Sequence, residues 1–296
     1  MRRSGRTQLL ALAAAAEAIA GAALTQLERD ETAVLAGSGA GESNDTVEFL
    51  RNMIANDEAA PKPSKFINSV PSSVAGQIAL EFGLRGETAV FMQHSASFEA
   101  ALWQGLQTLR NGRVPFALVC GADAIERDVL AVGYARAWWR KDAANFDVAE
   151  DSKQVIGSIP GEGAAAFLLA PSGSHGRPVM GRVTVSLPQH FPGIDPEREA
   201  AAIAAFLKSA GVSPRELAFV LTGANGNGVL GHSYRRVMEA AGLPVPARTY
   251  KQTCGEFCAA ASLGLFTAMR ELPGPGVALI YHLNGFRART LMLVRK

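Results

Sequence analysis

The spacing of apolar side chains between residues 86 and 121 changes from that of a strand to that of a helix and back again. This is the most regular pattern in the chain. Residues 89–93 are predicted to form a strand, Ser95 lies in the following turn, and helical spacing continues to Gly112. Residues 114–120 are almost continuously apolar, which is typical of a strand covered on both faces. The pattern predicts a βαβ unit with Ser95 at its strand-to-helix corner. The helical positions are Phe98, Ala101, Leu102, Gly105, Leu106 and Leu109.

Another strand and helix precede this unit. Residues 32–36 form a short apolar run, a glycine-rich loop follows, and residues 46–55 show helical spacing. Residues 56–65 are predicted to be a loop, and residues 70–84 a helix that opens at Pro71. The order of strand, loop and helix is typical of an α/β fold.

The second half of the chain repeats this order. Residues 218–221 are predicted to be a strand, residues 222–228 are a turn rich in glycine and asparagine, and residues 233–241 are predicted to be a helix. A long helix is predicted to carry Phe257 and Met269 on one face. Two closing strands are predicted over residues 277–282 and 290–294. The repetition predicts a duplicated α/β architecture.

Serine, glycine and proline gather between the two halves, which places a linker there. We therefore predict an N-terminal half over residues 1–170 that contains the Ser95 corner, a linker over residues 171–196, and a C-terminal half over residues 197–296.

The N-terminal segment has arginines ahead of an alanine-rich run, a composition that resembles a signal peptide. Glu17 interrupts the run, and its apolar residues fall on one helical stripe, so a docked amphipathic helix is predicted instead. No apolar run approaches the roughly 20 residues that a membrane span needs. The predicted stripe is Leu9, Leu12, Ala16, Ile19 and Ala23.

Composition and charge exclude several classes of protein. The 296 residues are 48% hydrophobic and 19% charged, which excludes a mainly disordered chain. A net charge of +2 leaves no excess to neutralise phosphates, so nucleic acid is not an expected partner. The three cysteines lack paired CxxC spacing, so neither a disulfide framework nor a metal site is expected. Reduced thiols in a cytoplasmic protein are predicted.

Four blocks of sequence then carry a resemblance to a known family. Residues 86–121 resemble the nucleophile region of the beta-ketoacyl synthases, and PGEGAA at 160–165 is similar to their glycine-acid-glycine motif. Residues 222–228 stand where that family has its first catalytic histidine loop, and residues 251–260 where it has a lysine and a second histidine. The resemblance covers the chain from about Arg6 to its end. It implies the duplicated, five-layered αβαβα architecture of the thiolases.

The departures from this family concern its catalytic side chains. Aligned without gaps from Gly86, Ser95 stands at the position of the nucleophilic cysteine, Asn225 at that of the first histidine, and Glu256 at that of the second. Lys251 matches the family's lysine. The resemblance therefore implies a degenerate ketosynthase, inactive in condensation by itself.

Each of these residues also has a structural explanation. Ser95 either accepts an acyl group at a helix N-terminus or caps that helix, with Ser97 nearer the N-cap position. Thr253 and Glu256 fit a T-x-x-E capping box, which explains Glu256 without chemistry. Asn225 lies between small residues of a turn, where a left-handed conformation is common. The candidate bases are His94, His232 and His282.

The resemblance is strongest to chain-length factors, the non-condensing partners of an active ketosynthase, and to the short ketosynthase-like subunits of aryl polyene-type pathways. It implies a dimer with an active ketosynthase subunit through the strand at residues 114–120. It also implies an acyl carrier protein as a partner in fatty acid or polyketide-type biosynthesis. No resident cofactor is expected, although the acyl-phosphopantetheine of the carrier would be a ligand, which Arg287 and Arg289 could face.

The alternative hypothesis is a serine-dependent acyl thioester hydrolase or acyltransferase that uses Ser95. It requires a base about 2.6–3.2 Å from the Ser95 hydroxyl.

Overall fold

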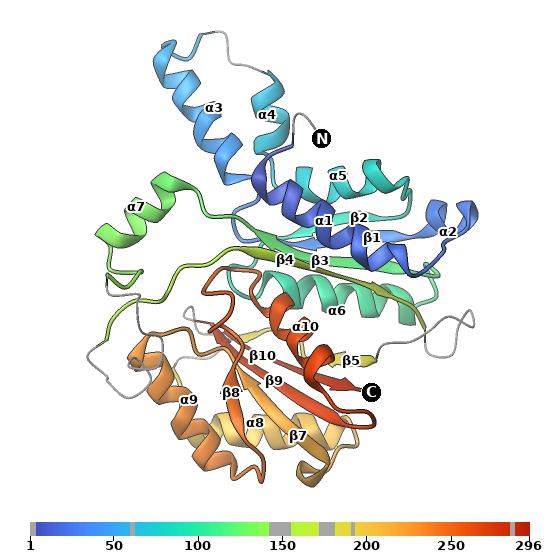
Figure 1. The fold of residues 1–296 in the computed structure, drawn as a ribbon, viewed down its shortest axis with the longest axis vertical. Helices are drawn as coiled ribbons and strands as arrows, with labels where there is room; N and C mark the ends of the chain where they lie inside the picture. The colour runs from blue at the N-terminus through green and yellow to red at the C-terminus, as the bar shows by residue number, and fades with distance from the viewer. Residues whose placement is uncertain (1–3, 60–62, 142–154, 172–180, 191–192, 285–287) are drawn as a thin grey trace. The chain divides into compact units, whose positions relative to one another are not determined.

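The structure, a computed structural model, describes residues 4–59, 63–141, 155–171, 181–190, 193–284 and 288–296. The chain forms two compact units (Figure 1). Unit 1 comprises Met1–Glu126, Glu162–Arg177 and Phe257–Ser262, and unit 2 comprises Arg127–Gly161, Pro178–Glu256 and Leu263–Lys296. The division into an N-terminal half that ends at residue 170 and a C-terminal half that begins at residue 197 remains a prediction.

Unit 1 is built, within its described residues, on a four-stranded sheet in the order β2-β1-β3-β4. Strand β1 pairs in parallel with β2 and β3, whereas β4 is antiparallel to β3. The strands are β1 (Ala33–Gly37), β2 (Thr88–Phe91), β3 (Ala117–Asp123) and β4 (Gly163–Leu169). The helices are α1 (Arg6–Ala20), α2 (Gln26–Glu31), α3 (Ser43–Ala55), α4 (Pro63–Ser69), α5 (Ser73–Phe82) and α6 (Ser97–Arg110).

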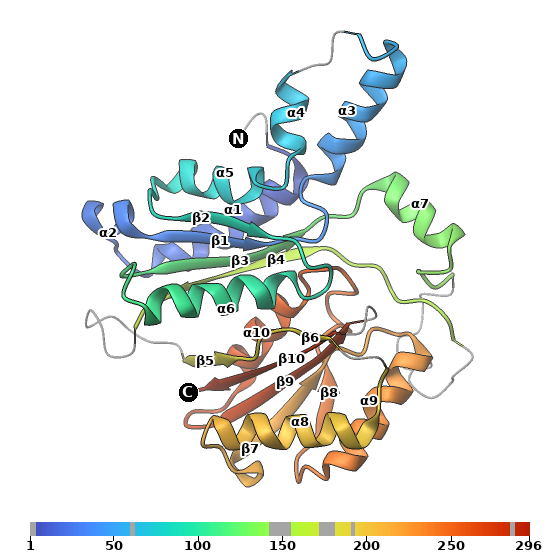
Figure 2. The same ribbon diagram turned by 180° about the vertical axis from the view of Figure 1, so that it is seen from behind.

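Helices cover both faces of this sheet, α1 and α5 on one and α6 on the other (Figures 1 and 2). Leu12 and Ile19 of α1 and Ile78 of α5 meet Leu118 of β3 in the core. On the opposite face Gly105 of α6 lets the helix approach, because a Cβ there would lie 2.8 Å from the Val119 side chain. The predicted βαβ unit is confirmed.

The predicted apolar stripe of α1 is partly wrong. Leu12 and Ile19 are buried, but Leu9 is 44% exposed and Ala16 is exposed. The polar Gln8 is buried in their place, because the Glu42 carboxylate accepts its backbone N–H at 3.1 Å and its amide donates to Ser73. Hydrogen bonding at the start of the helix therefore shifts its buried face.

The expectation that residues 114–120 pair with a counterpart across a dimer is wrong. These residues lie largely in β3, which has β1 on one edge and β4 on the other. Both edges of β3 are already hydrogen-bonded. Within the described residues, the edge strands of this sheet are β2 and β4.

The described residues of unit 2 contain a six-stranded sheet in the order β5-β10-β9-β7-β8, and β6 also pairs with β10. Helices α8 and α9 pack together over one face, where Ile203, Tyr234 and Leu279 share a core. The strands are β5 (Arg182–Val185), β6 (Gln189–His190), β7 (Leu217–Thr222), β8 (Ala247–Thr249), β9 (Val277–Asn284) and β10 (Ala288–Arg295). The helices are α7 (Arg127–Ala135), α8 (Pro196–Ser209), η2 (Pro214–Glu216, a 3₁₀ turn), α9 (Gly228–Ala241) and α10 (Ala261–Glu271), whose first two residues belong to unit 1.

Helix α10 begins later than the sequence predicts. Phe257 and Ala260 precede its first residue, Ala261. In unit 1 the backbone N–H of Ala259 donates to Oδ2 of the buried Asp123 at 2.8 Å. This hydrogen bond replaces a helical one and holds the segment in turn conformation.

The close approach of β1 to the Ser95 corner gives a test of this packing. A Cβ at Gly37 would lie 2.5 Å from the backbone of Phe98, whereas a Cβ at Gly76 would meet nothing within 4 Å. We expect Gly37→Ala to lower the free energy of unfolding by roughly 1–3 kcal/mol, the usual cost of overpacking. Gly76→Ala, inside α5, should be neutral or stabilising by up to about 1 kcal/mol. Urea unfolding followed by circular dichroism measures both, and equal stabilities would contradict the packing described.

Candidate functional site

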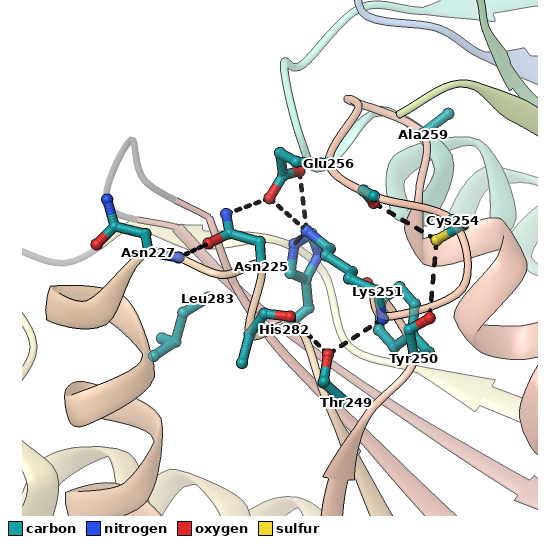
Figure 3. A network of polar contacts seen from close by, with 12 residues as sticks. Asn225, Asn227, Thr249, Tyr250, Lys251, Cys254, Glu256, Ala259, His282 and Leu283 are labelled. Atoms are coloured by element: carbon teal, nitrogen blue, oxygen red, sulfur yellow. Dashed lines mark hydrogen bonds and ion pairs between the residues drawn. The ribbon is translucent and has the colours of Figure 1, made fainter. Parts of the chain in front are cut away.

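Two loops of unit 2 carry the residues that sequence comparison singled out. Asn225 follows β7, and Lys251 and Glu256 follow β8. Because β7 and β8 pair in parallel, their carboxyl ends lie at one edge of the sheet. The Thr249 hydroxyl ties the loops together, since it donates to the Ala224 carbonyl at 2.5 Å and accepts from the backbone N–H of Lys251 at 3.1 Å. The structure therefore brings three of the four predicted site residues together (Figure 3).

An ion pair lies at the centre of this group. The Lys251 ammonium donates to both carboxylate oxygens of Glu256, at 2.8 and 2.7 Å. The Asn225 amide donates to the same carboxylate. The Lys251 side chain is only 1% exposed and that of Glu256 is 16% exposed. Such a buried cation needs a bonded anion, and Glu256 supplies it.

His282 completes the group from β9. Its Nε2 lies 3.5 Å from the Lys251 ammonium. The imidazole fits because residue 223 is a glycine. A Cβ added at this position would lie 2.5 Å from His282 Cδ2. Of the three candidate histidines, His282 is the one that the structure brings to this network (Figure 3).

A backbone segment missed by sequence analysis connects Asn225 to Glu256. The N–H of Ile159 donates to the Asn225 carbonyl at 3.1 Å, and the Ile159 carbonyl accepts from the N–H of Glu256 at 2.7 Å. The N–H of Gly161 then donates to the Glu256 carbonyl at 3.0 Å. We call residues 159–161 the strap. The strap therefore fixes the backbone at both Asn225 and Glu256.

Two glycines allow the strap to lie this close. A Cβ at Gly161 would lie 1.8 Å from the Cys254 carbonyl oxygen. Gly255 adopts φ +70°, and a Cβ added there would lie 2.7 Å from the Pro160 carbonyl oxygen. The glycine at position 161, noted in the sequence only as part of a motif, therefore has a steric role at the site.

The T-x-x-E capping box predicted at Glu256 is wrong. The Thr253 hydroxyl donates to the Tyr250 carbonyl at 3.0 Å, and no helix begins here, since α10 starts at Ala261. Glu256 is held by tertiary partners instead. The predicted turn at Asn225 is present, although the left-handed residue is the following Gly226, with φ +86°.

Ser95 lies at the predicted corner, in unit 1, and is buried. It does not cap α6, whose N-cap is Ala96 and has no side-chain cap. Ser97 binds the turn instead, since its hydroxyl donates to the His94 carbonyl at 2.5 Å and accepts from the Gln93 N–H at 2.9 Å. His94 is the strained residue, with φ +49°. Among the described residues of unit 1, none forms a hydrogen bond with the Ser95 hydroxyl.

Residues 1–175, more than half of the chain, match the family model described as Beta-ketoacyl synthase, N-terminal domain. The chain belongs to the beta-ketoacyl synthase family.

Relatives agree with this assignment. The tetracenomycin polyketide synthase ketoacyl synthase alpha subunit of Streptomyces glaucescens is 28% identical over 205 residues, 63% of this chain and 47% of the relative. This ketosynthase-like chain thus spans about half the length of that curated relative.

Solved structures share the fold. The ishigamide ketosynthase/chain length factor gives a TM-score of 0.83 at 20% identity, covering 100% of this chain and 83% of that chain. A type II PKS acyl-carrier protein in complex with its ketosynthase bound to the hexaketide, AntDE:AntF, gives 0.79 at 15% identity, covering 98% and 84%. The predicted thiolase-like α/β fold is confirmed.

Arg287 and Arg289 are the two arginines expected to face a phosphopantetheine ligand. Arg289 does not point to a free ligand, because it pairs with the buried Glu199 at 2.6 Å and donates to Gln189. Arg287 lies outside the described residues.

Within the described chain, no group of three or more His, Cys, Asp or Glu side chains could hold a metal ion. No helix among the described residues is long and apolar enough to span a membrane.

Two cysteine thiols of this ketosynthase-like chain, Cys120 and Cys254, have pKa values that burial raises. Burial raises the pKa of Cys120 to about 12 and that of Cys254 to about 11, although the Lys251 charge opposes the second shift. Only the thiolate is nucleophilic, so neither thiol is activated near neutral pH.

Alkylation kinetics test these thiol environments. At pH 8 the thiolate fraction of Cys254 should be on the order of one in a thousand, and its iodoacetamide rate should rise about tenfold per pH unit up to pH 10. Peptide mapping by mass spectrometry distinguishes it from the other cysteines, and urea-unfolded chain serves as the control. Rapid labelling of Cys254 in the folded chain at pH 8 would contradict the assignment.

The buried ion pair is tested by a double-mutant cycle. Lys251→Met and Glu256→Gln should each lower the free energy of unfolding by roughly 3 kcal/mol, because each leaves a buried group without its partner. The double variant should lose clearly less than the sum. Glu271→Gln, which breaks the exposed pair with Arg248, should cost less than about 1 kcal/mol. Additive losses for Lys251 and Glu256 in urea unfolding would exclude a coupled pair.

Proposed function

We propose that this chain is a non-condensing, ketosynthase-like subunit that acts with a condensing beta-ketoacyl synthase, as a chain-length factor does. The observation that carries the proposal is the Asn225–Glu256–Lys251 network. The sequence resemblance aligns Asn225 and Glu256 with the family's two imidazoles. The whole protein's reaction, substrates and partners belong to this proposal.

Condensation in this family needs a thiolate to hold the acyl group and two imidazoles at the thioester oxygen of the malonyl unit while carbon dioxide leaves. At the aligned positions the chain offers a serine hydroxyl, an amide and a carboxylate. The Asn225 amide already donates to Glu256. The Glu256 carboxylate, held by the Lys251 ammonium, only accepts hydrogen bonds, so it cannot donate one to the thioester oxygen or the enolate as an imidazole does. The chemistry of these three side chains thus opposes decarboxylation and condensation.

Relatives support a role within an assembly. The similar solved structures include a ketosynthase/chain length factor and a ketosynthase with its acyl-carrier protein. We extend this to a heterodimer with a condensing subunit that receives acyl groups from the phosphopantetheine of a carrier protein. Aryl polyene-type biosynthesis, of the fatty acid or polyketide kind, and a cytoplasmic location are parts of the same proposal. No resident cofactor is proposed.

Release of carbon dioxide tests the proposal directly. The purified chain, incubated with malonyl carrier protein, should release carbon dioxide at the rate of the control without enzyme, because both imidazoles are replaced. A condensing ketosynthase serves as the positive control. Release above the background would contradict the non-condensing role.

Ser95 distinguishes the proposal from a serine-dependent hydrolase or acyltransferase. Its hydroxyl has no hydrogen bond within the described part of unit 1, so Ser95→Ala should change the free energy of unfolding by less than about 1 kcal/mol. The product yield of the ketosynthase assembled with this variant should stay near that of the wild type. A folded Ser95→Ala variant that stops product formation, or an acyl adduct on Ser95 by mass spectrometry, would favour the serine enzyme.

A further inference from the structure

One corner of the unit 2 sheet places two arginines directly opposite each other. Among the described residues β5 is an edge strand, and its antiparallel pairing with β10 sets Arg182 against Arg295. Both residues are exposed. Directly opposite residues of an antiparallel pair project from the same face of the sheet, and like charges at such positions are destabilising. The stability of the sheet therefore does not explain this pair.

Helix α8 accounts for one of the two arginines. The Arg295 guanidinium donates to the carbonyl of Ala210, the C-cap of α8, at 2.5 Å, and cations are favourable at a helix C-terminus. The Arg182 side chain forms no hydrogen bond or ion pair with any residue that the structure describes. Lys208, in the last turn of α8 and two residues before Ala210, is also exposed. We call Arg182, Lys208 and Arg295 the basic corner.

The segments that form the basic corner contain no acidic side chain. Residues 178–194, 200–215 and 272–296 have neither aspartate nor glutamate. The acids that border these segments have partners of their own: Asp195 caps α8, Glu199 binds Arg289, Glu216 accepts from the Ser213 N–H, and Glu271 binds Arg248. These segments therefore supply no counter-ion for the three charges of the basic corner.

The chemistry of the basic corner selects a multiply charged anion. A guanidinium group stays charged at physiological pH, and its paired N–H donors match the oxygens of a phosphate group. Three cations exceed the charge of a single carboxylate, whereas a diphosphate group carries several negative charges on closely spaced oxygens. Because all three side chains are exposed, a small molecule that carries such a group can reach them.

We propose that the basic corner binds the diphosphate group of a small phosphorylated molecule. The anion contacts the guanidinium groups of Arg182 and Arg295, with the Lys208 ammonium as a third contact, and its charge offsets the repulsion between the two arginines. The inference goes beyond the proposed function and does not depend on it, because the basic corner shares no residue with the network around Lys251.

Isothermal titration calorimetry with pyrophosphate at low salt tests the basic corner. Arg182→Glu and Lys208→Glu should each weaken binding by about tenfold or more, because each removes a cation and adds an anion. The matched control is Arg236→Glu, which makes the same change in net charge at an exposed position of α9. Helix α9 connects β7 to β8, far along the sheet order from β5, so this control should change binding less than about twofold.

Urea unfolding without ligand separates a binding role of Arg182 from a structural one. Arg182→Glu should raise the urea midpoint, because a carboxylate opposite Arg295 replaces a pair of like charges with a pair of opposite charges. A lowered midpoint would assign Arg182 to the stability of the fold and overturn the site.

The remaining outcomes are equally decisive. Wild-type chain that binds no pyrophosphate up to about 10 mM would overturn the proposal. Equal weakening by Arg236→Glu would show general electrostatic attraction in place of a site. Citrate that binds as tightly as pyrophosphate would overturn the choice of a phosphate group. Phosphatidylglycerol vesicles that bind through Arg182, where pyrophosphate does not, would replace the small molecule with a membrane surface.

Discussion

A buried ammonium group is the constraint on which the site depends. Lys251 has almost no exposed surface, and a cation without a partner in such a place costs several kcal/mol. Glu256 meets this requirement with two oxygens, and Asn225 donates to the same carboxylate. The Glu256 carboxylate therefore stabilises the fold by neutralising this cation. In the function proposed above, the same carboxylate stands in place of a group that decarboxylation needs.

Backbone hydrogen bonds also hold the two loops around this pair. The strap at residues 159–161 binds Asn225 and Glu256 through three backbone hydrogen bonds, and Gly161 and Gly255 leave room for it. Thr249 and His282 approach from the adjoining strands. The backbone of this ketosynthase-like chain thus holds Asn225 and Glu256 together independently of their side-chain chemistry.

Much of this architecture could be predicted from periodicity, since the strands before Ser95 and Asn225 and the helices after them show clear patterns. The errors arose where local pattern competed with distant partners. Thr253 and Glu256 match a capping box, but the Lys251 ammonium binds Glu256 and Asp123 holds Ala259 outside the helix. The strap could not be predicted, because its contacts join residue 159 to positions more than sixty residues away through backbone atoms. The interior place of β3 likewise depends on β4, which follows it only after a long intervening segment.

The state of the Lys251 side chain tests the account most directly. Heteronuclear NMR of chain labelled with ¹⁵N-lysine, assigned with Lys251→Met, should show at neutral pH a slowly exchanging ammonium signal from Lys251, because burial and its bonds to Glu256 shield it from water. The signal should be lost or shifted in Glu256→Gln and unchanged in Glu271→Gln. A Lys251 signal that exchanges as fast as those of exposed lysines, or that Glu256→Gln leaves unchanged, would contradict the ion pair at the centre of the site.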